Sequence, residues 1–270
     1  MMYLGKQEQQ GLLAARGVPH IAQLVEAFTF QESAASGESL VIVTEYAEGQ
    51  SLESLAKQLS QGAGWEQRKL PLMKNILAQI CEALKQLHGR GWCHGDLNPT
   101  NVLVNLGSGP ADVRVTIIDL GGSMPGQLGA GALPMAHPLC SSPEVKGWFN
   151  GMCKQGLMPP PDMLAYDVWS MGCLLVLWLT GENAFDSDQY SAAAFAREVD
   201  QKHREWADKH ALFRKPRFCQ RTPFCKIACQ AVDDERYDSC WELLWKMLQP
   251  SQQCRARIQD VINSKFMSTE

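Results

Sequence analysis

The sequence predicts an α+β fold in which a small cap of one helix and two strands covers a larger, mostly helical body. Strand-like runs of β-branched and aromatic residues gather near the N-terminus, at 21–30 and 40–46. From Ser51 onward the apolar residues recur mostly at the spacings of an amphipathic helix. A chain of 270 residues, 45% of them hydrophobic, is long enough to bury one sizeable core.

The cap begins with the helix-forming segment 6–16, which is followed by Gly17 and Pro19, a helix stop and a turn. The two strand-like runs come next and are joined by the polar turn QESAASGES. Two strands and one helix form a thin layer, and a lone hairpin is marginally stable at best. We therefore expect the cap to depend on contacts with other parts of the protein.

The body begins with a short helix and a long one. The apolar face of the long helix is formed by Leu72, Ile76, Leu77, Ile80, Leu84 and Leu87. Residues 121–140 are rich in Gly, Pro, Ser and Ala without periodicity, which predicts a long loop of the kind that is usually functional or disordered. In chain order the predicted elements are helices 51–60 and 71–90, strands 101–105 and 113–119, the loop, a central apolar helix 165–180, a helix at 240–248 and a final segment 257–266.

Charge and hydropathy argue against some partners. The net charge of −4 results from 29 acidic and 25 basic residues that are mixed along the chain. Such a distribution offers no basic surface to nucleic acid or to an anionic membrane, so we expect neither as a partner. The longest apolar run, GCLLVLWL at 172–179, is far shorter than the ~20 residues of a membrane span. It predicts a buried core helix and no membrane insertion.

The ten cysteines are scattered, and some of them lie inside apolar helical patterns. Because the polar N-terminus does not resemble a signal peptide, this usage indicates a reducing compartment, the cytoplasm or the nucleus. The densest group consists of Cys219, Cys225 and Cys229, with Cys240 further on. It lacks the C-x-x-C pairs of zinc sites, so we expect no metal there.

The stretch CHGDLNPTNVLV at 93–104 places polar residues at fixed offsets inside an apolar run. Phosphoryl transfer from a nucleotide needs a placed hydroxyl, metal ions on the phosphates and neutralised charge. Asp96 has the chemistry to accept a hydroxyl proton, Asn101 to ligate a metal, and Asp119 to bridge metal and phosphate. Taken alone, an Asp at this position would as readily cap a turn.

The chain resembles the eukaryotic-type protein kinase family in five motifs that follow one another in the family's order. One such motif would be a weak signal, but five in order from about Ile21 to Phe266 are specific. The motifs are HGDLNPTN at 94–101, similar to the catalytic loop H-R-D-L-x-x-x-N; DLG at 119–121, similar to D-F-G; SPE at 142–144, similar to A-P-E; the segment 166–185, similar to D-x-W-S-x-G with T-G-x-x-P-F after it; and MLQPSQQCR at 247–255, similar to the late segment whose Arg pairs with the A-P-E Glu.

This resemblance implies a protein-kinase-like fold with a truncated N-lobe and a complete, mostly α-helical C-lobe. The partial N-lobe would occupy 1–47, with a helix, two or three strands and a hinge at 45–47. The C-lobe would occupy 48–270 and contain the catalytic loop at 94–101 and the activation segment at 119–144.

The resemblance also implies roles for single residues. Asp96 would be the catalytic base in phosphoryl transfer from ATP to a Ser or Thr of a protein substrate. The other implied site residues are Asn101 and Asp119 as Mg²⁺ ligands, Thr44 at the gatekeeper position, the backbones of Glu45 and Ala47 at the adenine edge, and Leu103 beneath the adenine ring.

Other positions are structural in the family. Glu144 and Arg255 would form a buried ion pair, and Asp167 would hold the backbone of the catalytic loop. The family also stacks a regulatory column of side chains, onto which His94, Leu120, Leu13 and Leu24 fall. His94 is therefore expected to be a packed structural residue and not an acid or base.

The first departure from the family concerns the N-terminus. A Gly-rich loop and a strand Lys, both of which hold the phosphates, precede the helix that here begins near Lys6, and the 270 residues contain neither. The Glu that pairs with this Lys falls on Gln9 by counting back from Pro19, with Glu8 one position away.

Two more departures lie inside the catalytic loop. Asn98 stands where serine/threonine kinases usually carry a Lys that reaches the transferred phosphate, and the loss of one such charge costs ~10²-fold or more in rate. Gly95 replaces the Arg that normally binds a phosphorylated activation segment, so we expect no control by phosphorylation there. The chain is therefore expected to be a weak catalyst.

Three hypotheses remain open. The first is a serine/threonine kinase domain that is incomplete as given, binds Mg-ATP weakly and tends to aggregate through its exposed strands; retention of the Asp, Asn and Asp positions favours it. The second is a pseudokinase that acts as a binding or scaffold module. The third is a small-molecule phosphotransferase of the aminoglycoside or choline type, which shares the H-G-D form but lacks segments like SPE and DVWSMG.

Overall fold

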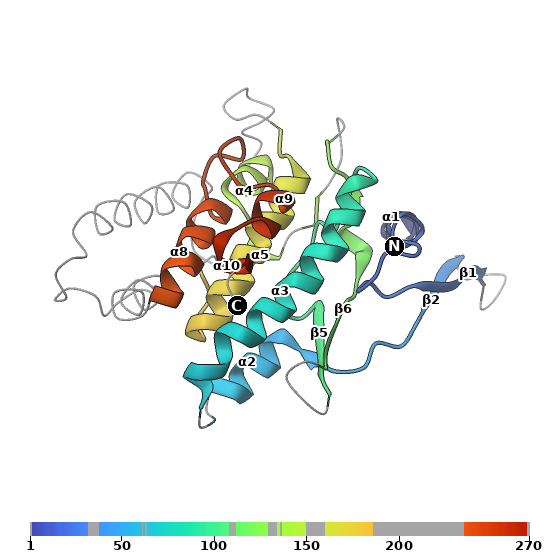
Figure 1. The fold of residues 1–270 in the computed structure, drawn as a ribbon. Coiled ribbons are helices and arrows are strands. Elements are labelled where there is room, and N and C mark those ends of the chain that lie inside the picture. Colours follow the sequence, from blue (N-terminus) through green and yellow to red (C-terminus); the bar gives the residue numbers. More distant parts are fainter. Residues whose placement is uncertain are drawn as a thin grey trace.

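A helical body and a smaller cap on one side of it make up the computed structural model (Figure 1). The structure describes residues 2–31, 38–60, 62, 64–107, 112–128, 134–135, 137–149, 160–185 and 235–268. The helices in these ranges are α1 (Met2–Ala14), α2 (Leu52–Ser60), α3 (Trp65–Gly89), α4 (Pro143–Phe149), α5 (Met163–Thr180), α8 (Glu235–Met247), α9 (Ile258–Ile262) and α10 (Lys265–Ser268). Two short 3-10 helices are η1 (Leu120–Gly122) and η2 (Pro138–Cys140).

The strands of the described ranges form three small antiparallel sheets. The first joins β1 and β2 in the cap, the second has the order β3-β5-β6, and the third joins β4 and β7. Their bounds are β1 (Leu24–Phe30), β2 (Ser39–Thr44), β3 (Gln50–Ser51), β4 (Trp92–Cys93), β5 (Val102–Leu106), β6 (Val113–Ile117) and β7 (Met124–Pro125). These elements agree with the predicted α+β class, whereas the division into lobes at 47 and 48 stays a prediction.

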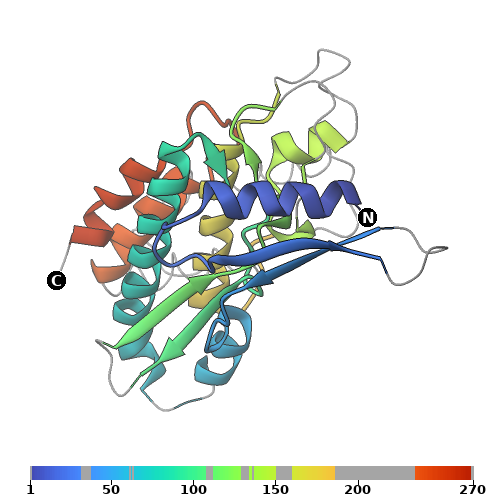
Figure 2. The ribbon, with the colours of Figure 1, turned by 90° about the vertical axis from the view of Figure 1, so that its right-hand side faces the viewer.

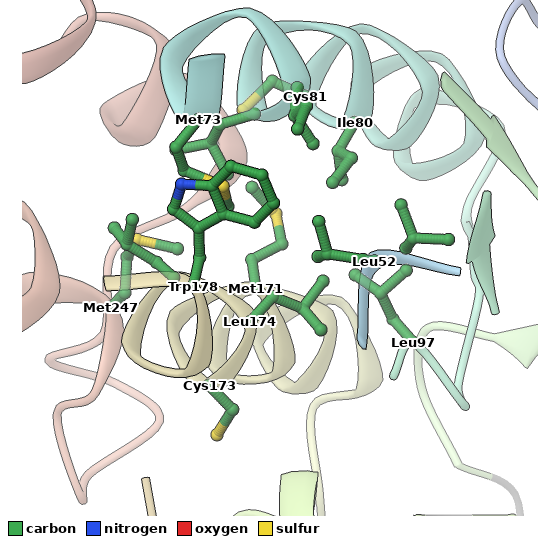
Figure 3. Packing of buried hydrophobic residues seen from close by; sticks show 14 of the residues in the cluster. Leu52, Met73, Ile80, Cys81, Leu97, Met171, Cys173, Leu174, Trp178 and Met247 are labelled. Carbon is green, nitrogen blue, oxygen red and sulfur yellow. The ribbon is translucent and has the colours of Figure 1, made fainter. Parts of the chain in front are cut away.

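The core of the body lies between α3 and α5. Trp178 of α5 is buried, its ring centroid lies 5.0 Å from that of Trp65, and its indole N–H donates to the Lys69 carbonyl at 2.8 Å. Figure 3 shows Met73 and Ile80 of α3 and Trp178 of α5 facing one another across this core. The apolar face predicted for the long helix is thus the face that packs.

Helix α5 is, among the described residues, the one helix long and apolar enough to cross a membrane by length and composition. However, 89% of this stretch is buried inside the protein. A core helix of a folded domain passes the same test, and the burial agrees with the predicted core helix.

Helix α3 begins earlier than predicted. The sequence predicts a start at Pro71, but the helix begins at Trp65 and contains Pro71 in its interior. Proline lacks the N–H that an interior position donates, so this placement costs one hydrogen bond. The burial of Trp65 and Lys69 in the preceding turn explains why the helix nevertheless extends to them.

The cap consists of α1 and the β1–β2 hairpin, which run side by side in Figure 2. One face of the hairpin meets α1, because a Cβ added at Gly5 would lie 3.2 Å from the Leu40 side chain. The cap also has exposed apolar side chains, namely Leu13, Val25, Phe28, Phe30 and Val43. A two-stranded sheet cannot bury both of its faces against one helix.

Several contacts between the described residues attach the cap to the body, and two of them hold the end of α1 and the turn that follows it. Arg90, just after α3, donates from Nη1 to the carbonyls of Ala14 and Arg16 at 2.7 and 2.8 Å, which satisfies the C-terminal end of α1. Ile21, between α1 and β1, forms an isolated bridge with Ile117 of β6. The end of α1 and the turn after it are therefore held by the body.

Candidate functional site

The catalytic loop at 94–101 is held by one buried carboxylate. Asp167 of α5 is fully buried, and its two oxygens accept the backbone N–H groups of His94 and Gly95 at 2.8 and 2.9 Å. His88 Nε2 lies 2.8 Å from the same carboxylate. Because a buried charge is tolerated only when it is hydrogen-bonded, these contacts fix the loop and the carboxylate together. The role expected for Asp167 is confirmed.

His94 is a structural residue. Its ring is fully buried, Nδ1 accepts the N–H of Asp96 at 3.3 Å, and Nε2 lies 3.2 Å from the Ile118 carbonyl. With Nδ1 used as an acceptor, Nε2 is the ring nitrogen that donates to that carbonyl. Both nitrogens are thus engaged, which confirms His94 as a packed residue that ties the loop to the end of β6.

Asp96 has one carboxylate oxygen without a hydrogen-bond partner. Oδ1 is buried, and no donor in the described part of the chain reaches it, whereas Oδ2 lies 3.4 Å from Asn101 Nδ2. Burial above all, and to a smaller extent the charge of Asp119, raise the pKa of Asp96, while His94 and Asn98 act in the opposite direction. A buried acceptor that has no hydrogen-bond donor destabilises the protein, and such an oxygen is suited to take a proton from a substrate group.

Asn101 uses its amide nitrogen inside the loop. Nδ2 donates to the Asp96 carbonyl at 3.0 Å, and the Asn101 carbonyl accepts the N–H of Ile118 at 2.9 Å. The second bond places the residue beside the segment that leads to Asp119. The amide oxygen of Asn101 takes no hydrogen bond from the described residues, so it is free to act as a metal ligand.

Asp119 stands at the turn after β6 and is exposed. Its backbone has φ 63° and ψ 82°, and its Oδ1 accepts the N–H of Gly121 at 3.1 Å. A positive φ is uncommon for a residue other than Gly and often occurs where the surrounding structure enforces it for function. The geometry presents the carboxylate at the edge of the catalytic loop.

Glu8 of α1 lies near Asp119. Burial, and then the negative charge of Asp119, raise the pKa of Glu8. The close approach of the helix is set by Gly11, where an added Cβ would lie 2.6 Å from Ser123 Cβ. The cap thus contributes a second carboxylate beside Asp119, and the two repel each other.

The register of α1 differs by one residue from the predicted one. The count from Pro19 placed the family's Glu on Gln9 and a column residue on Leu13, but Leu13 is 50% exposed and Leu12 is 3% exposed. Glu8 and Leu12 are four residues apart and share one helix face. The placement of Leu13 in the buried column was therefore wrong, because Leu12 and not Leu13 lies on the buried face of α1.

Asn98 has a role that the sequence analysis missed. Its side chain is buried, Nδ2 donates to the Asp96 carbonyl at 3.1 Å, and Oδ1 accepts the N–H and the hydroxyl of Thr100 at 2.9 and 2.6 Å. The tendency of Asn to bond the backbone two residues away is the signal that could have predicted it. Asn98 rigidifies the loop at the position where the family usually has a Lys.

Gly95 lies in close contact with the turn after Asp119. Its φ is 77°, and an added Cβ would lie 2.1 Å from the Gly122 carbonyl oxygen. A Cβ added at Gly122 would in turn lie 2.8 Å from Asp96 Cβ. The two backbones touch, so the Arg that the family carries at position 95 does not fit this arrangement.

The residues predicted to contact the adenine ring lie along the connection from β2 to β3 and on β5. Thr44 ends β2, and the N–H of Glu45 donates to the Gln23 carbonyl at 2.9 Å. Ala47 and Leu103 are half-buried, and Leu103 pairs in register with Ser51. Their contacts with a nucleotide stay a prediction.

A cavity of about 440 Å³ opens beside this connection. The turn after α1 and strands β5 and β6 line its other walls. Of the predicted site residues, Glu45 and Ala47 line it, but Thr44, Leu103 and Asp96 do not. This cavity is therefore separate from the place where Asp96, Asn101 and Asp119 meet.

The oxygen atoms of the candidate ligands are of the type that Mg²⁺ prefers. The described residues contain no group of three or more His, Cys, Asp or Glu that could hold a metal ion by itself. Asn101 and Asp119 offer two oxygen ligands, and Mg²⁺ typically completes its octahedron with waters and substrate phosphates. Of the cysteine group, Cys240 is buried in the core, and Cys219, Cys225 and Cys229 lie outside the described residues.

The predicted ion pair between Glu144 and Arg255 is confirmed. Arg255 Nη1 and Nη2 donate to the two oxygens of Glu144 at 2.5 and 2.9 Å, and both residues are buried. The guanidinium also stacks over Trp169 at 4.9 Å from the ring centroid. This bidentate pair fixes the start of α4, where the predicted activation segment ends.

Residues 6–267 match the family model described as protein kinase domain. Three curated proteins are similar to parts of the chain. Cyclin-dependent kinase 8 of Caenorhabditis elegans is 35% identical over 135 residues, 44% of this chain and 20% of that protein. Serine/threonine-protein kinase PKZ1 of Phytophthora infestans is 27% identical over 169 residues (58% and 38%), and serine/threonine-protein kinase SBK2 of Homo sapiens is 32% identical over 130 residues (46% and 33%). The chain spans less than half the length of these three relatives.

Proposed function

Since this chain belongs to the protein kinase family, we propose that it transfers the γ-phosphoryl group of ATP to a Ser or Thr hydroxyl of a protein substrate, with Asp96 as the base. The preference for Ser and Thr is supported by relatives that are named serine/threonine kinases. The family match favours a protein substrate over the small-molecule substrates of the aminoglycoside and choline enzymes.

The observation that carries the proposal is the unpartnered Oδ1 of Asp96. A hydroxyl that hydrogen-bonds this oxygen would transfer its proton to Asp96 as its own oxygen bonds the phosphorus. Burial raises the pKa of Asp96 and so brings its basicity nearer to the range in which a general base is effective. The backbone of the loop is held by Asp167, so the base needs little rearrangement.

Asn101 and Asp119 would hold Mg²⁺ between the catalytic loop and the phosphates. Mg²⁺, when bound, neutralises phosphate charge and aligns the transferred group. The carboxylates of Glu8 and Asp119 support this assignment, because their mutual repulsion disfavours the ionised form of Glu8 and a cation between loop and phosphates would relieve it.

The rate is expected to be low. Asn98 stands where the family usually has the Lys that reaches the transferred phosphate. The loss of this charge donor lowers the rate by ~10²-fold or more. Asn98 supports the second candidate, a pseudokinase that binds a partner, because its amide is fully used within the loop.

The test compares wild type with Asp96→Asn in a transfer assay that uses γ-labelled ATP, Mg²⁺ and a Ser/Thr peptide mixture. Asp96→Asn should lower transfer by ~10²- to 10⁴-fold, the usual contribution of a general base. Asp238→Asn, the same chemical change at an exposed position of α8, is the matched control and should transfer at the wild-type rate.

Binding of Mg-ATP is measured on the same three proteins by calorimetry. Equal transfer by wild type and Asp96→Asn would reject Asp96 as the base. Mg-ATP binding without any transfer above the uncatalysed background would favour the pseudokinase.

A further inference from the structure

The cavity of about 440 Å³ beside the connection from β2 to β3 has a rigid wall in the turn after α1. The side chain of Gln23 holds this turn together. Its Nε2 donates to the carbonyls of Val18 and Ile21 at 3.0 and 2.7 Å, and its Oε1 accepts the Gly17 N–H at 2.6 Å. Because one side chain satisfies three backbone groups of the turn, the wall keeps its shape without a ligand.

A second wall is formed by β6 together with α3. Gln79 of α3 donates from Nε2 to the Val113 carbonyl at 2.8 Å and accepts the Val115 N–H at 2.9 Å. The first wall is joined to this one, because the Ile117 N–H donates to the His20 carbonyl at 2.7 Å. A cavity of this size with fixed walls is typical of a preformed small-ligand site.

Two carboxylates line the cavity from the connection itself, which Figure 1 shows running from β2 toward β5. They belong to Glu45 and Glu48, and in the described part of the chain neither forms an ion pair. Asn105 of β5 also lines the cavity, and its Nδ2 donates to Glu48 Oε2 at 3.2 Å. Asn105 thus orients one carboxylate without neutralising its charge.

The basic side chains of the lining each have a carboxylate of their own. Arg114 Nη2 lies 3.5 Å from Asp112 Oδ1, and His20 Nε2 lies 3.4 Å from Glu82 Oε2. Neither Asp112 nor Glu82 lines the cavity. The charge that the lining offers to a ligand is therefore negative, and it favours a cation.

Tyr46 adds an aromatic ring between the two carboxylates in sequence. It lines the cavity and is 90% exposed, so the face of its ring is open to a ligand. A guanidinium group is planar, bonds a carboxylate through two parallel N–H groups and stacks on an aromatic ring. The combination of Glu45, Tyr46 and Glu48 matches all three properties.

We propose that this cavity binds a guanidinium group, which pairs with Glu45 and Glu48 and stacks on Tyr46. The group belongs either to a free small molecule or to an arginine side chain of another protein, because the same three side chains recognise both. A primary ammonium binds less tightly, since it lacks the planar fork and the flat surface. The proposal does not rest on phosphoryl transfer, because the cavity is separate from Asp96 and the readout is binding.

The experiment titrates the ¹⁵N-labelled full chain with agmatine and, separately, with a short peptide that contains one arginine. Amide shifts in the nuclear magnetic resonance spectrum locate the ligand. The amides of 45–48 and 114–116 should shift with both ligands. The same peptide with citrulline, which keeps the shape of arginine without its charge, should leave them unchanged. The tighter of the two cationic ligands identifies the source of the group.

Three variants test the contacts one at a time. Glu45→Gln and Glu48→Gln should each weaken agmatine binding by about fivefold, as expected for an ion pair that is partly open to solvent. Tyr46→Leu removes the ring and should weaken it by about two- to fivefold. Glu26→Gln, the same chemical change at an exposed position of β1 outside the cavity, is the matched control and should bind like wild type.

All four substitutions are at exposed positions, and thermal unfolding checks that each variant is folded. The proposal is overturned if ~10 mM agmatine shifts none of the amides of 45–48 and 114–116. It is also overturned if the citrulline peptide binds as tightly as the arginine peptide, or if Glu45→Gln and Glu48→Gln both bind agmatine like wild type.

Discussion

The body of this protein is packed more completely than its cap. In the body, α3 and α5 bury whole apolar faces, and the buried charges of Asp167, Glu144 and Arg255 are all hydrogen-bonded. In the cap, the β1–β2 hairpin and α1 leave large apolar side chains such as Phe28 and Phe30 exposed. The site chemistry of the catalytic loop therefore rests on the better-packed region.

This difference in packing also divides the residues of the candidate site between the two regions. Asp96, Asn101 and Asp119 stand on or beside elements of the body, whereas the cap contributes Glu8 through one helix face. Because local stability follows buried apolar contact and protected hydrogen bonds, we expect the cap to open at a lower free energy than the body. Substitutions in the two regions should reveal that contrast.

The largest loss of stability is expected from the buried ion pair of the body. Glu144→Gln leaves the Arg255 guanidinium buried without its charge partner, which costs about 3–5 kcal/mol in the free energy of unfolding. Denaturant titration followed by tryptophan fluorescence measures it. Arg257→Ala breaks the exposed pair with Asp162 and is the control, with a loss of about 1 kcal/mol or less. Equal losses would mean that burial does not set the strength of these pairs.

A Leu→Ala substitution should lower the free energy of unfolding much more in the body than in the cap. Leu174→Ala removes a fully buried side chain from the core of α5 and should lower the free energy of unfolding by about 2–5 kcal/mol. Leu13→Ala removes a half-exposed side chain from α1 and should change it by about 0.5 kcal/mol or less. Chemical denaturation of both variants checks this. A cap variant as damaging as the core variant would contradict the contrast.

The attachment of the cap to the body should be separable from the stability of the body. Arg90→Ala removes the donors that cap the C-terminal end of α1, a loss of about 1 kcal/mol that we expect in the cap alone. Hydrogen exchange of the α1 amides should become about fivefold faster, while exchange in α5 stays unchanged. Lys85→Ala, at an exposed position of α3, is the control and should alter neither.

The smallest effect is expected from Glu8 and depends on pH. Its pKa is raised in the folded protein, so the folded state binds this proton more tightly than the unfolded state does. Stability is therefore lost as pH rises from the ordinary value of 4.5 through the raised value, and the loss persists above it. Glu8→Gln should melt at a higher temperature than wild type at neutral pH, with the difference vanishing below the ordinary value.

Thermal unfolding at several pH values measures this difference. Glu242→Gln, at an exposed position of α8, is the matched control and should follow wild type. A Glu8→Gln protein that melts lower than wild type at neutral pH would show that Glu8 has a favourable partner.

Much of the body could be predicted from the sequence. The apolar periodicity of α3 and the continuous apolar run of α5 indicate buried helices without knowledge of their neighbours. The order of the motifs allowed the pairing of Glu144 with Arg255 to be predicted across 111 residues. These features depend on patterns that are local or that the family shares.

The register of α1 and the roles of Arg90 and Asn98 could not be predicted in this way. The apolar residues of α1 gather at its two ends around a polar centre and do not mark one helix face, so its buried face is decided by the contact of Gly11 with Ser123 and not by its own pattern. Arg90 and Asn98 bind backbone carbonyls whose position follows only from the folded chain. The start of α3 was missed because burial of Trp65 outweighs the helix-breaking tendency of Pro71.

The contact between Gly95 and Gly122 constrains how this sequence can change. An Arg restored at position 95 would place its Cβ inside the Gly122 carbonyl, so the substitution alone gives a clash and not a phosphate-responsive residue. The turn at 121–122 would have to move first, and that turn is held in place by Gly11 of α1 and by the Ser123 hydroxyl, which donates to the Cys93 carbonyl at 2.6 Å. An Arg at position 95, as in the family's H-R-D form, is therefore compatible with this fold only if several other positions change at the same time.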